Sequence, residues 1–255
     1  MVSVVCEQAV RFPALCGGWL CQPFVHWRYP PDQVQALLPA GLRVDTWDGV
    51  AWVGLTPLLM TDIRPLGLPS LPLTRRWCTF PETNLRTYVR GPDGRQGLWF
   101  LSIDVSSAVT AAATRALSGA PYHLADLSVT GDGTRWSYAG TRRGGRPGYR
   151  LRIRVGRPVS PTGREAWLTS RWRAYTRHLT GLLVTPVQHE PWPLAEAVIE
   201  ELAEDLTEAA GLPAPADDPI AHFSPGVHRV RLGRPALPAA VGAVGATADT
   251  TRQTR

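Results

Sequence analysis

One short segment brings together hydrogen-bonding side chains of four kinds. It reads FPETNLRTYVRG from Phe80, and the two-residue repeat of a β-strand places Glu82, Asn84, Arg86 and Tyr88 on one face. Such a row either forms a solvated face with an ion pair between Glu82 and Arg86 or lines a polar cavity. In a dry pocket, Glu82 would be an acid or base with a raised pKa, and Arg86 would hold a substrate carboxylate.

A second group of candidates follows an alanine-rich segment. In APYHLADL, Tyr122 and His123 come just after Pro121, where we expect a loop that could aim both side chains into a cavity. Tyr122 and His123 are therefore candidate proton donors or oxyanion stabilisers. A lone histidine in a loop is more often structural, and both interpretations of His123 stay open.

Aromatic and imidazole side chains supply the remaining candidates for substrate contact. His189 and Trp192 belong to the turn HEPWPL, and His26 belongs to FVHWRYP. A rigid helix entry with an aromatic ring packed on the sheet explains the turn equally well. Trp52, Trp99 and Trp192 could form walls of a pocket.

The chain has no lysine, because all 27 of its basic residues are arginine. This excludes Schiff-base chemistry, pyridoxal-phosphate anchoring and a P-loop. The sequence also lacks the G-x-S-x-G, H-E-x-x-H and G-x-G-x-x-G motifs, and its six histidines show no helical pairing. We therefore predict no cofactor and no metal site.

The formal net charge is +6, which raises the possibility of nucleic-acid binding. Twelve arginines and one acid lie in residues 135–177, and six acids without a base lie in residues 196–208. These two regions could face each other. We expect a small-molecule ligand, no nucleic acid and no membrane, and we leave a homo-oligomer open.

Strand patterns dominate the first two thirds of the chain. GVAWVGLTPLLM from Gly49 and GLWFLSIDV from Gly97 are apolar strands buried on both sides, whereas RWSYAG and YRLRIRV alternate like half-exposed antiparallel strands. The predicted fold class is α+β, with a large antiparallel sheet closed into a barrel around an internal cavity and a few flanking helices.

Four segments have helical patterns. They are PPDQVQALLP from Pro30, SSAVTAAATRALSG from Ser106, REAWLTSRWRAYTRHL from Arg164 and WPLAEAVIEELAEDLTEAAG from Trp192. The last is the strongest, with Leu194, Val198, Ile199, Leu202 and Leu206 in one stripe. The third is rich in aromatic residues, which leaves a strand possible there.

The domain expectation is one folded unit over residues 1–234 and a disordered tail over residues 235–255, which contains no aromatic residue. The first residues do not follow a signal-peptide pattern, and no apolar run is long enough to span a membrane. The four cysteines match no zinc or redox spacing. We expect a cytoplasmic protein.

Several of these segments together resemble the YqjF-like family of uncharacterised bacterial proteins. The resemblance spans about residues 18 to 231, and its most specific parts are the E-x-N-x-R-T-Y-V strand and the H-x-P-W-P-L turn. The family is grouped with the acetoacetate decarboxylase-like fold, which implies a cone-shaped, largely antiparallel sheet enclosing an internal site.

True acetoacetate decarboxylases form an imine with a lysine that follows a proline in a segment similar to LSGAPYHL. The corresponding position here is Tyr122. The resemblance matches a glutamate of that superfamily to Glu82, while its cavity arginine has no clear counterpart and Arg86 is only a substitute. The fold does not carry the function by itself.

Three functions remain in competition. The first is an enzyme of the lyase, isomerase or cyclase type that acts on a small oxo or enol metabolite without a Schiff base, through Glu82, Arg86, Tyr122 and His123. The second is a small-molecule binding protein without catalysis. The third is a nucleic-acid-interacting protein that uses its arginine-rich surface.

Overall fold

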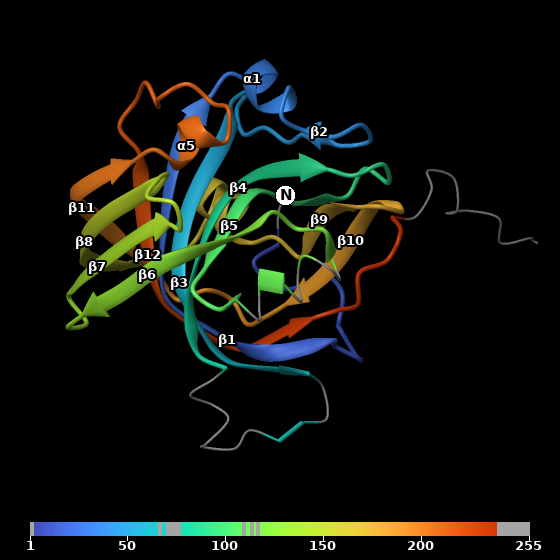
Figure 1. Cartoon of the computed structure of the whole chain (residues 1–255), viewed down its shortest axis with the longest axis horizontal. Coiled ribbons are helices and arrows are strands. Elements are labelled where there is room, and N and C mark those ends of the chain that lie inside the picture. The colour runs from blue at the N-terminus through green and yellow to red at the C-terminus, as the bar shows by residue number, and fades with distance from the viewer. Residues whose placement is uncertain are drawn as a thin grey trace, which may run out of the picture.

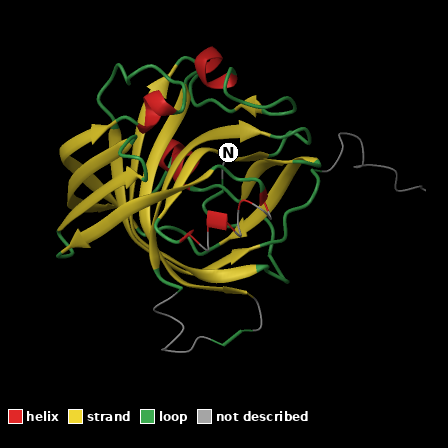
Figure 2. Cartoon of the chain, in the orientation of Figure 1, coloured by secondary structure: helices red, strands yellow, loops and turns green. Residues whose placement is uncertain are grey.

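The computed structural model describes residues 3–65, 68–69, 78–108, 111–112, 115 and 118–238, and most of them lie in β-strands (Figures 1 and 2). The strands are β1 (Leu15–Tyr29), β2 (Arg43–Val44), β3 (Ala51–Pro65), β4 (Phe80–Arg90), β5 (Gln96–Val105), β6 (Tyr122–Gly131), β7 (Arg135–Arg142), β8 (Gly148–Val159), β9 (Arg173–His178), β10 (Gly181–Gln188), β11 (Leu194–Glu204) and β12 (Ile220–Leu232). Three short helices whose bounds lie within the described residues accompany them: α1 (Pro31–Gln35), α4 (Gly163–Thr169) and α5 (Leu206–Ala209).

The sheet closes on itself. Its strand order is β10-β9-β5-β6-β7-β8-β11-β12-β1-β3-β4-β2, and the pairing of β4 with β5 closes a nine-strand mixed barrel. The pairing of β10 with β12 closes a second ring through β9, β5, β4, β3 and β1. Strands β1, β3, β4, β5 and β12 therefore form a wall shared by both rings. The predicted α+β class and closed barrel are confirmed.

The nine-strand barrel is filled by apolar side chains. Val25, Val53 and Leu85 from the shared wall pack with Leu151 and Ile153 of β8 in one buried cluster. Because side chains alternate along a strand, Glu82, Asn84, Arg86 and Tyr88 point from the opposite face of β4 into the second ring. The polar row thus lies outside the apolar barrel core.

The strands expected around residues 49–60, 80–90, 97–105, 135–140 and 149–155 are confirmed as parts of β3, β4, β5, β7 and β8. Strand β4 is buried from Phe80 to Val89 apart from the half-buried Pro81, and it pairs antiparallel with β3 and β5. The position of Tyr122 and His123 differs from the prediction. They are not in a loop but begin β6, which pairs parallel with β5.

The helix predicted from residue 192 to 211 is wrong. Residues 194–204 form β11, and only Leu206–Ala209 is helical. Pairing with β8 overrides helix propensity, because β11 completes the barrel and its alternate residues Ala197 and Ile199 pack against the barrel core. Val198, placed in the apolar stripe of the predicted helix, is 46% exposed.

The other three segments with helical patterns contain helical residues, but not over their full predicted length. The segment from Pro30 contains α1, which is shorter than expected. The segment from Arg164 splits, because α4 ends at Thr169 and β9 begins at Arg173. The segment at 106–119 lies partly outside the described residues, and its described positions 108, 111–112, 115 and 118 are helical.

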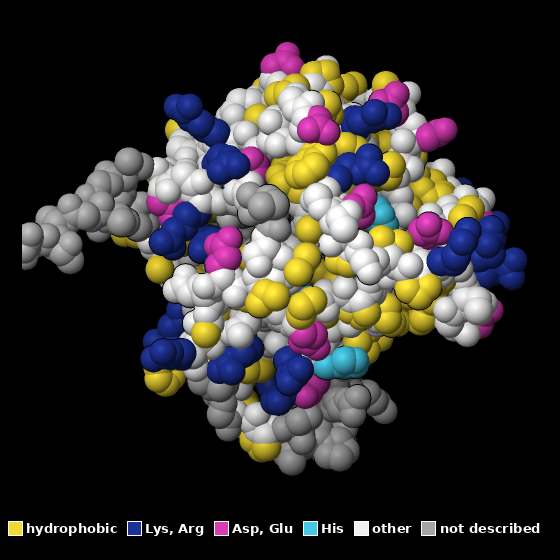
Figure 3. Space-filling model, turned by 180° about the vertical axis from the view of Figure 1, so that it is seen from behind, with side chains coloured by type: hydrophobic (Ala, Val, Ile, Leu, Met, Phe, Trp, Pro, Cys, Tyr) yellow, Lys and Arg dark blue, Asp and Glu magenta, His cyan; other side chains and the backbone are white. Residues whose placement is uncertain are grey.

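The arginine-rich and acidic regions do face each other, as two antiparallel neighbours. Glu200 of β11 lies within ion-pair distance of Arg135, Arg152 and Arg154, at 3.3 to 3.6 Å, and Arg150 pairs with Glu201 at 3.4 Å. Figure 3 likewise shows basic and acidic side chains interspersed over the rear face. The cations of β7 and β8 are thus partly neutralised within the sheet.

Within the described part of the chain, no helix combines the length and the apolar character that crossing a membrane requires. The predicted disordered tail lies outside the described residues from position 239 onward.

Gly54 leaves room for two side chains of the second ring to pack over the shared wall. It pairs with His26 on β1 and with Arg86 on β4, and a Cβ atom at Gly54 would lie 2.8 Å from the His26 ring. A strand glycine therefore provides the space for the His26 imidazole.

We expect Gly54→Ala to lower the free energy of unfolding by about 1–3 kcal/mol, because overpacking outweighs the entropic gain of alanine. Urea denaturation of both single variants and of the Gly54→Ala, His26→Ala double variant measures this. The loss caused by alanine should shrink once the ring is removed. Strict additivity of the two losses would show that the ring is not the obstacle.

Candidate functional site

The four polar side chains of β4 are all buried. The exposed fractions are 5% for Glu82, 8% for Asn84, 7% for Arg86 and 0% for Tyr88. A strand rises about 3.3 Å per residue, so the Cα atoms of Glu82 and Arg86 are roughly 13 Å apart. No ion pair joins these two residues, and the row has a carboxylate end and a guanidinium end.

At the carboxylate end, Glu82 meets neutral hydrogen-bonding groups. The side chains of Asn84 and Tyr122 hydrogen-bond to its carboxylate, and Tyr122 is brought there because it aligns with Ile103, which itself aligns with Asn84. Burial raises the pKa of Glu82 to about 7, although the two hydrogen bonds act in the opposite direction. The carboxyl group is therefore poised between its two protonation states near neutral pH.

At the guanidinium end, Arg86, Tyr88 and His26 share one hydrogen-bond network. The Tyr88 hydroxyl lies 2.5 Å from the Leu168 carbonyl, which can only accept, so the phenol proton points there. His26 Nε2 lies 2.7 Å from the same hydroxyl and must carry the proton that it donates. Arg86 also donates to this oxygen, and burial lowers the pKa of Arg86.

His26 is held as a neutral imidazole. Burial places its pKa well below 6.5, and the nearby charge of Arg86 lowers it further. With Nε2 protonated, the Nδ1 atom is a lone-pair acceptor, and it has no partner among the described residues.

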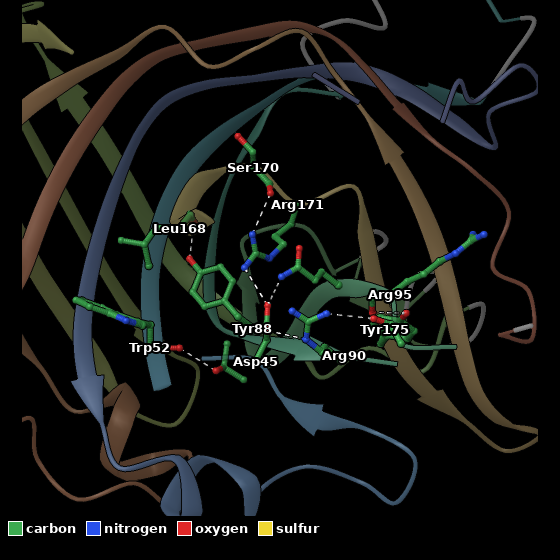
Figure 4. Close-up of polar contacts among 12 residues, drawn as sticks. Asp45, Trp52, Tyr88, Arg90, Arg95, Leu168, Ser170, Arg171 and Tyr175 are labelled. Atoms are coloured by element: carbon green, nitrogen blue, oxygen red, sulfur yellow. Dashed lines mark hydrogen bonds and ion pairs between the residues drawn. The ribbon is translucent and has the colours of Figure 1, made fainter. Parts of the chain in front are cut away.

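A second buried arginine, missed in the sequence analysis, stands beside the row. Arg171 stacks over the rings of Tyr88 and Trp167, at 4.8 and 4.4 Å from their centroids, and pairs with buried Asp45 at 3.4 Å (Figure 4). Burial lowers its pKa to about 10. Asp45 also accepts from Arg90 at 2.9 Å and Gln96 at 2.7 Å.

The HEPWPL turn packs beside Arg86 as an aromatic cluster. The ring centroids of His189 and Trp192 lie 4.8 Å apart, and the Trp192 ring packs edge-on against Phe24 with 5.2 Å between the ring centroids. Phe24 in turn lies under the Arg86 guanidinium, 5.5 Å from its ring centroid. Burial lowers the pKa of His189 to about 4. The turn enters strand β11 rather than a helix.

Of the two remaining candidates, Trp52 lies in the site and His123 lies outside it. Trp52 is 4% exposed and packs with Tyr88 and Trp167, so it belongs to the guanidinium end. His123 aligns with Asp104 and, as the neighbour of Tyr122, points to the other face of β6. Burial lowers the pKa of His123, and the charges of Arg142 and Arg115 add to the effect. The structure does not bring His123 to Glu82.

Several buried polar atoms on this side of the wall have no hydrogen-bond partner among the described residues. They are Gln22 Oε1, His26 Nδ1, Trp52 Nε1, Glu82 Oε2, Asn84 Oδ1 and Arg86 Nε. Unpaired buried polar atoms are rare in native proteins and call for an explanation, such as ordered water or a ligand. The set contains the donors Trp52 Nε1 and Arg86 Nε and the acceptor His26 Nδ1 at the guanidinium end, and the oxygens of Glu82 and Asn84 at the carboxylate end.

The site offers a cation, a titrating carboxyl group and neutral donors. In the described part of the chain, no three His, Cys, Asp or Glu side chains gather closely enough to hold a metal ion. The sequence could have flagged Asp45 and Arg171 only through their aromatic surroundings, DTWDG and SRWRAY, because nothing in the chain marks them as neighbours.

Solved structures of the acetoacetate decarboxylase-like fold resemble this one. An acetoacetate decarboxylase-like enzyme from Sphingomonas wittichii RW1 matches with a TM-score of 0.60 and 18% identity, covering 90% of this chain and 94% of that chain. The enduracididine biosynthesis enzyme MppR, complexed with the condensation product of pyruvate and imidazole 4-carboxaldehyde, matches with a TM-score of 0.65 and 16% identity, covering 90% and 91%. At this identity the likeness shows the fold.

Sequence comparison identifies the family. The chain is 32% identical over 206 residues to the uncharacterized protein YqjF of Bacillus subtilis (strain 168), covering 79% of this chain and 83% of that protein. The model of the DUF2071 family, described as an uncharacterized conserved protein, matches residues 18–228, which include the whole polar row and the HEPWPL turn. This chain belongs to the DUF2071 family.

Proposed function

We propose that this chain is an enzyme that performs acid/base chemistry on a small oxo or enol metabolite, with Glu82 as the proton-transferring group. The observation that carries the proposal is the burial of Glu82 with a pKa of about 7, beside Tyr122 and Asn84 and without a neutralising cation. A general acid or base is most effective when its pKa lies near the working pH.

The other end of the row would hold the substrate. Arg86 stays charged, and its buried Nε atom has no partner among the described residues, so it is a suitable donor to an anionic oxygen. A substrate oxygen held there would direct the rest of a small molecule along β4 toward Glu82. MppR has been solved with pyruvate, an oxo acid, which supports a ligand of this chemical type for the same fold.

Catalysis would proceed without an imine to lysine, since the chain has no lysine. The Glu82 carboxylate would remove a proton from a carbon next to the carbonyl. Tyr122 and Asn84, the groups that hydrogen-bond Glu82, would stabilise the developing enolate, and the protonated Glu82 would return the proton. Enolisation of this kind is the common first step of isomerase, lyase and cyclase reactions.

A binding protein without catalysis is the second candidate, and the unpaired atoms of the row favour it. A bound ligand would satisfy Asn84 Oδ1, His26 Nδ1 and Arg86 Nε whether or not a reaction follows. Such a protein would retain its ligand through purification and would convert none of it.

The raised pKa of Glu82 predicts a specific dependence of stability on pH. The pKa of Glu82 is about 7 in the folded state, against an ordinary value of 4.5 for glutamate, so the folded state holds an extra proton between these values and stability falls as pH rises across this window. The loss is about 3 kcal/mol by linkage. Glu82→Gln should therefore be more stable than the wild type at pH 8 and similar to it at pH 4.5.

Urea denaturation at half-unit steps from pH 4.5 to 8 measures this dependence. Glu196→Gln, which changes an exposed glutamate of β11, is the matched control and should keep the wild-type slope. Parallel profiles for Glu82→Gln and the wild type would contradict a titrating Glu82.

Hydrogen–deuterium exchange of pyruvate methyl protons, followed by NMR in D2O, tests the proposed chemistry. We expect the wild type to accelerate exchange and Glu82→Gln to lose about 10²-fold or more of that acceleration. The rate should rise with pH up to about 7 and then level off, because the base form is the carboxylate.

Arg86→Ala should mainly weaken pyruvate binding. Glu196→Gln should change neither pyruvate binding nor the rate of proton exchange. A folded Glu82→Gln variant with full exchange activity would refute the role of Glu82. Tight binding of pyruvate without exchange would favour the binding protein instead.

A further inference from the structure

A groove on the outside of the molecule lies where β2 pairs with the end of β4. Its volume is about 920 Å³, and it is open to solvent. The lining residues are Gln35, Gly41, Leu42, Arg43, Val44, Arg90, Gly91, Pro92 and Gly94. Two of them are arginines, and no aspartate or glutamate is among them.

The two arginines stand directly opposite each other. Strand β2 is only two residues long, and its register aligns Arg43 with Arg90. Like charges at directly opposed positions of neighbouring strands destabilise the pair. Within the described part of the chain, no carboxylate forms an ion pair with Arg43. The pairing of β2 thus gathers two cations at the groove, and Asp45 balances only one of them, Arg90.

The groove is held in shape by side-chain contacts with the backbone. The Gln35 amide accepts from Val44 N at 2.8 Å and donates to the Leu42 carbonyl at 3.1 Å, so it clamps the chain on both sides of Arg43. Arg90 Nε is fixed by Asp45 at 2.9 Å, and Asp45 is fixed in turn by buried Arg171. The backbone around Arg43 and the side chain of Arg90 are therefore anchored.

We propose that this groove binds a small oxyanion with two negative charges, of the phosphate or phosphate-monoester type, between Arg43 and Arg90. The planar guanidinium group matches the geometry of phosphate oxygens, and two such groups would each satisfy part of the anion. The bound anion would also remove the repulsion between the two cations. This site is separate from the polar row of β4 and does not depend on the proposed reaction.

Titration with inorganic phosphate by isothermal calorimetry at constant ionic strength tests the site. We expect saturable binding that Arg43→Gln weakens tenfold or more. Arg157→Gln, which changes an exposed arginine of β8, should alter the dissociation constant less than twofold. Because Arg43 is exposed, Arg43→Gln should fold, and without phosphate it should be at least as stable as the wild type.

The amide NMR signals of glycines locate the bound anion. Phosphate should shift the signals of Gly41, Gly91 and Gly94, which line the groove, and leave that of Gly54 in the shared wall unchanged. Glycerol phosphate in place of inorganic phosphate shows whether an ester is accepted. The proposal is overturned by absence of saturable binding, by equal weakening in the two variants, or by shifts that gather at Gly54.

Discussion

From Glu82 to Val89, strand β4 is buried on both faces because it lies in the wall between two closed rings, yet one of these faces carries four polar side chains. Buried polar groups are costly unless they are hydrogen-bonded. The surrounding elements supply the partners: Tyr122 reaches Glu82, and His26 and the Leu168 carbonyl reach the Tyr88 hydroxyl.

The ion pair of Asp45 and Arg171 links the buried polar row to the surface of the protein. The pair is buried, and Arg171 is also held by stacking on Tyr88 and Trp167. Removing one partner of a buried ion pair typically costs 3–5 kcal/mol, because the other charge stays buried and unpaired. Asp45 also holds Arg90, so one carboxylate connects the polar row with the outer groove.

The sequence correctly predicted that the four polar residues share one face of a strand, but it assigned the residues of β11 to a helix. Alternation alone placed Glu82, Asn84, Arg86 and Tyr88 on one face, because a strand covered on both sides leaves little freedom. The segment at 194–204 carried a helical apolar stripe and became β11, since pairing with β8 and the arginines of that strand outweigh local propensity. Arg171 was missed because its partner Asp45 lies 126 residues away in the chain.

The sequence by itself determined which chemistry is excluded and which side chains share a strand face. The absence of lysine rules out a lysine imine in any fold, and a period of two is a local property of the backbone. Only the tertiary structure decided that Glu82 titrates near pH 7, that His26 is neutral and that His123 points away from the row. Burial and distant partners set these properties, and both arise only when segments far apart in the chain pack together.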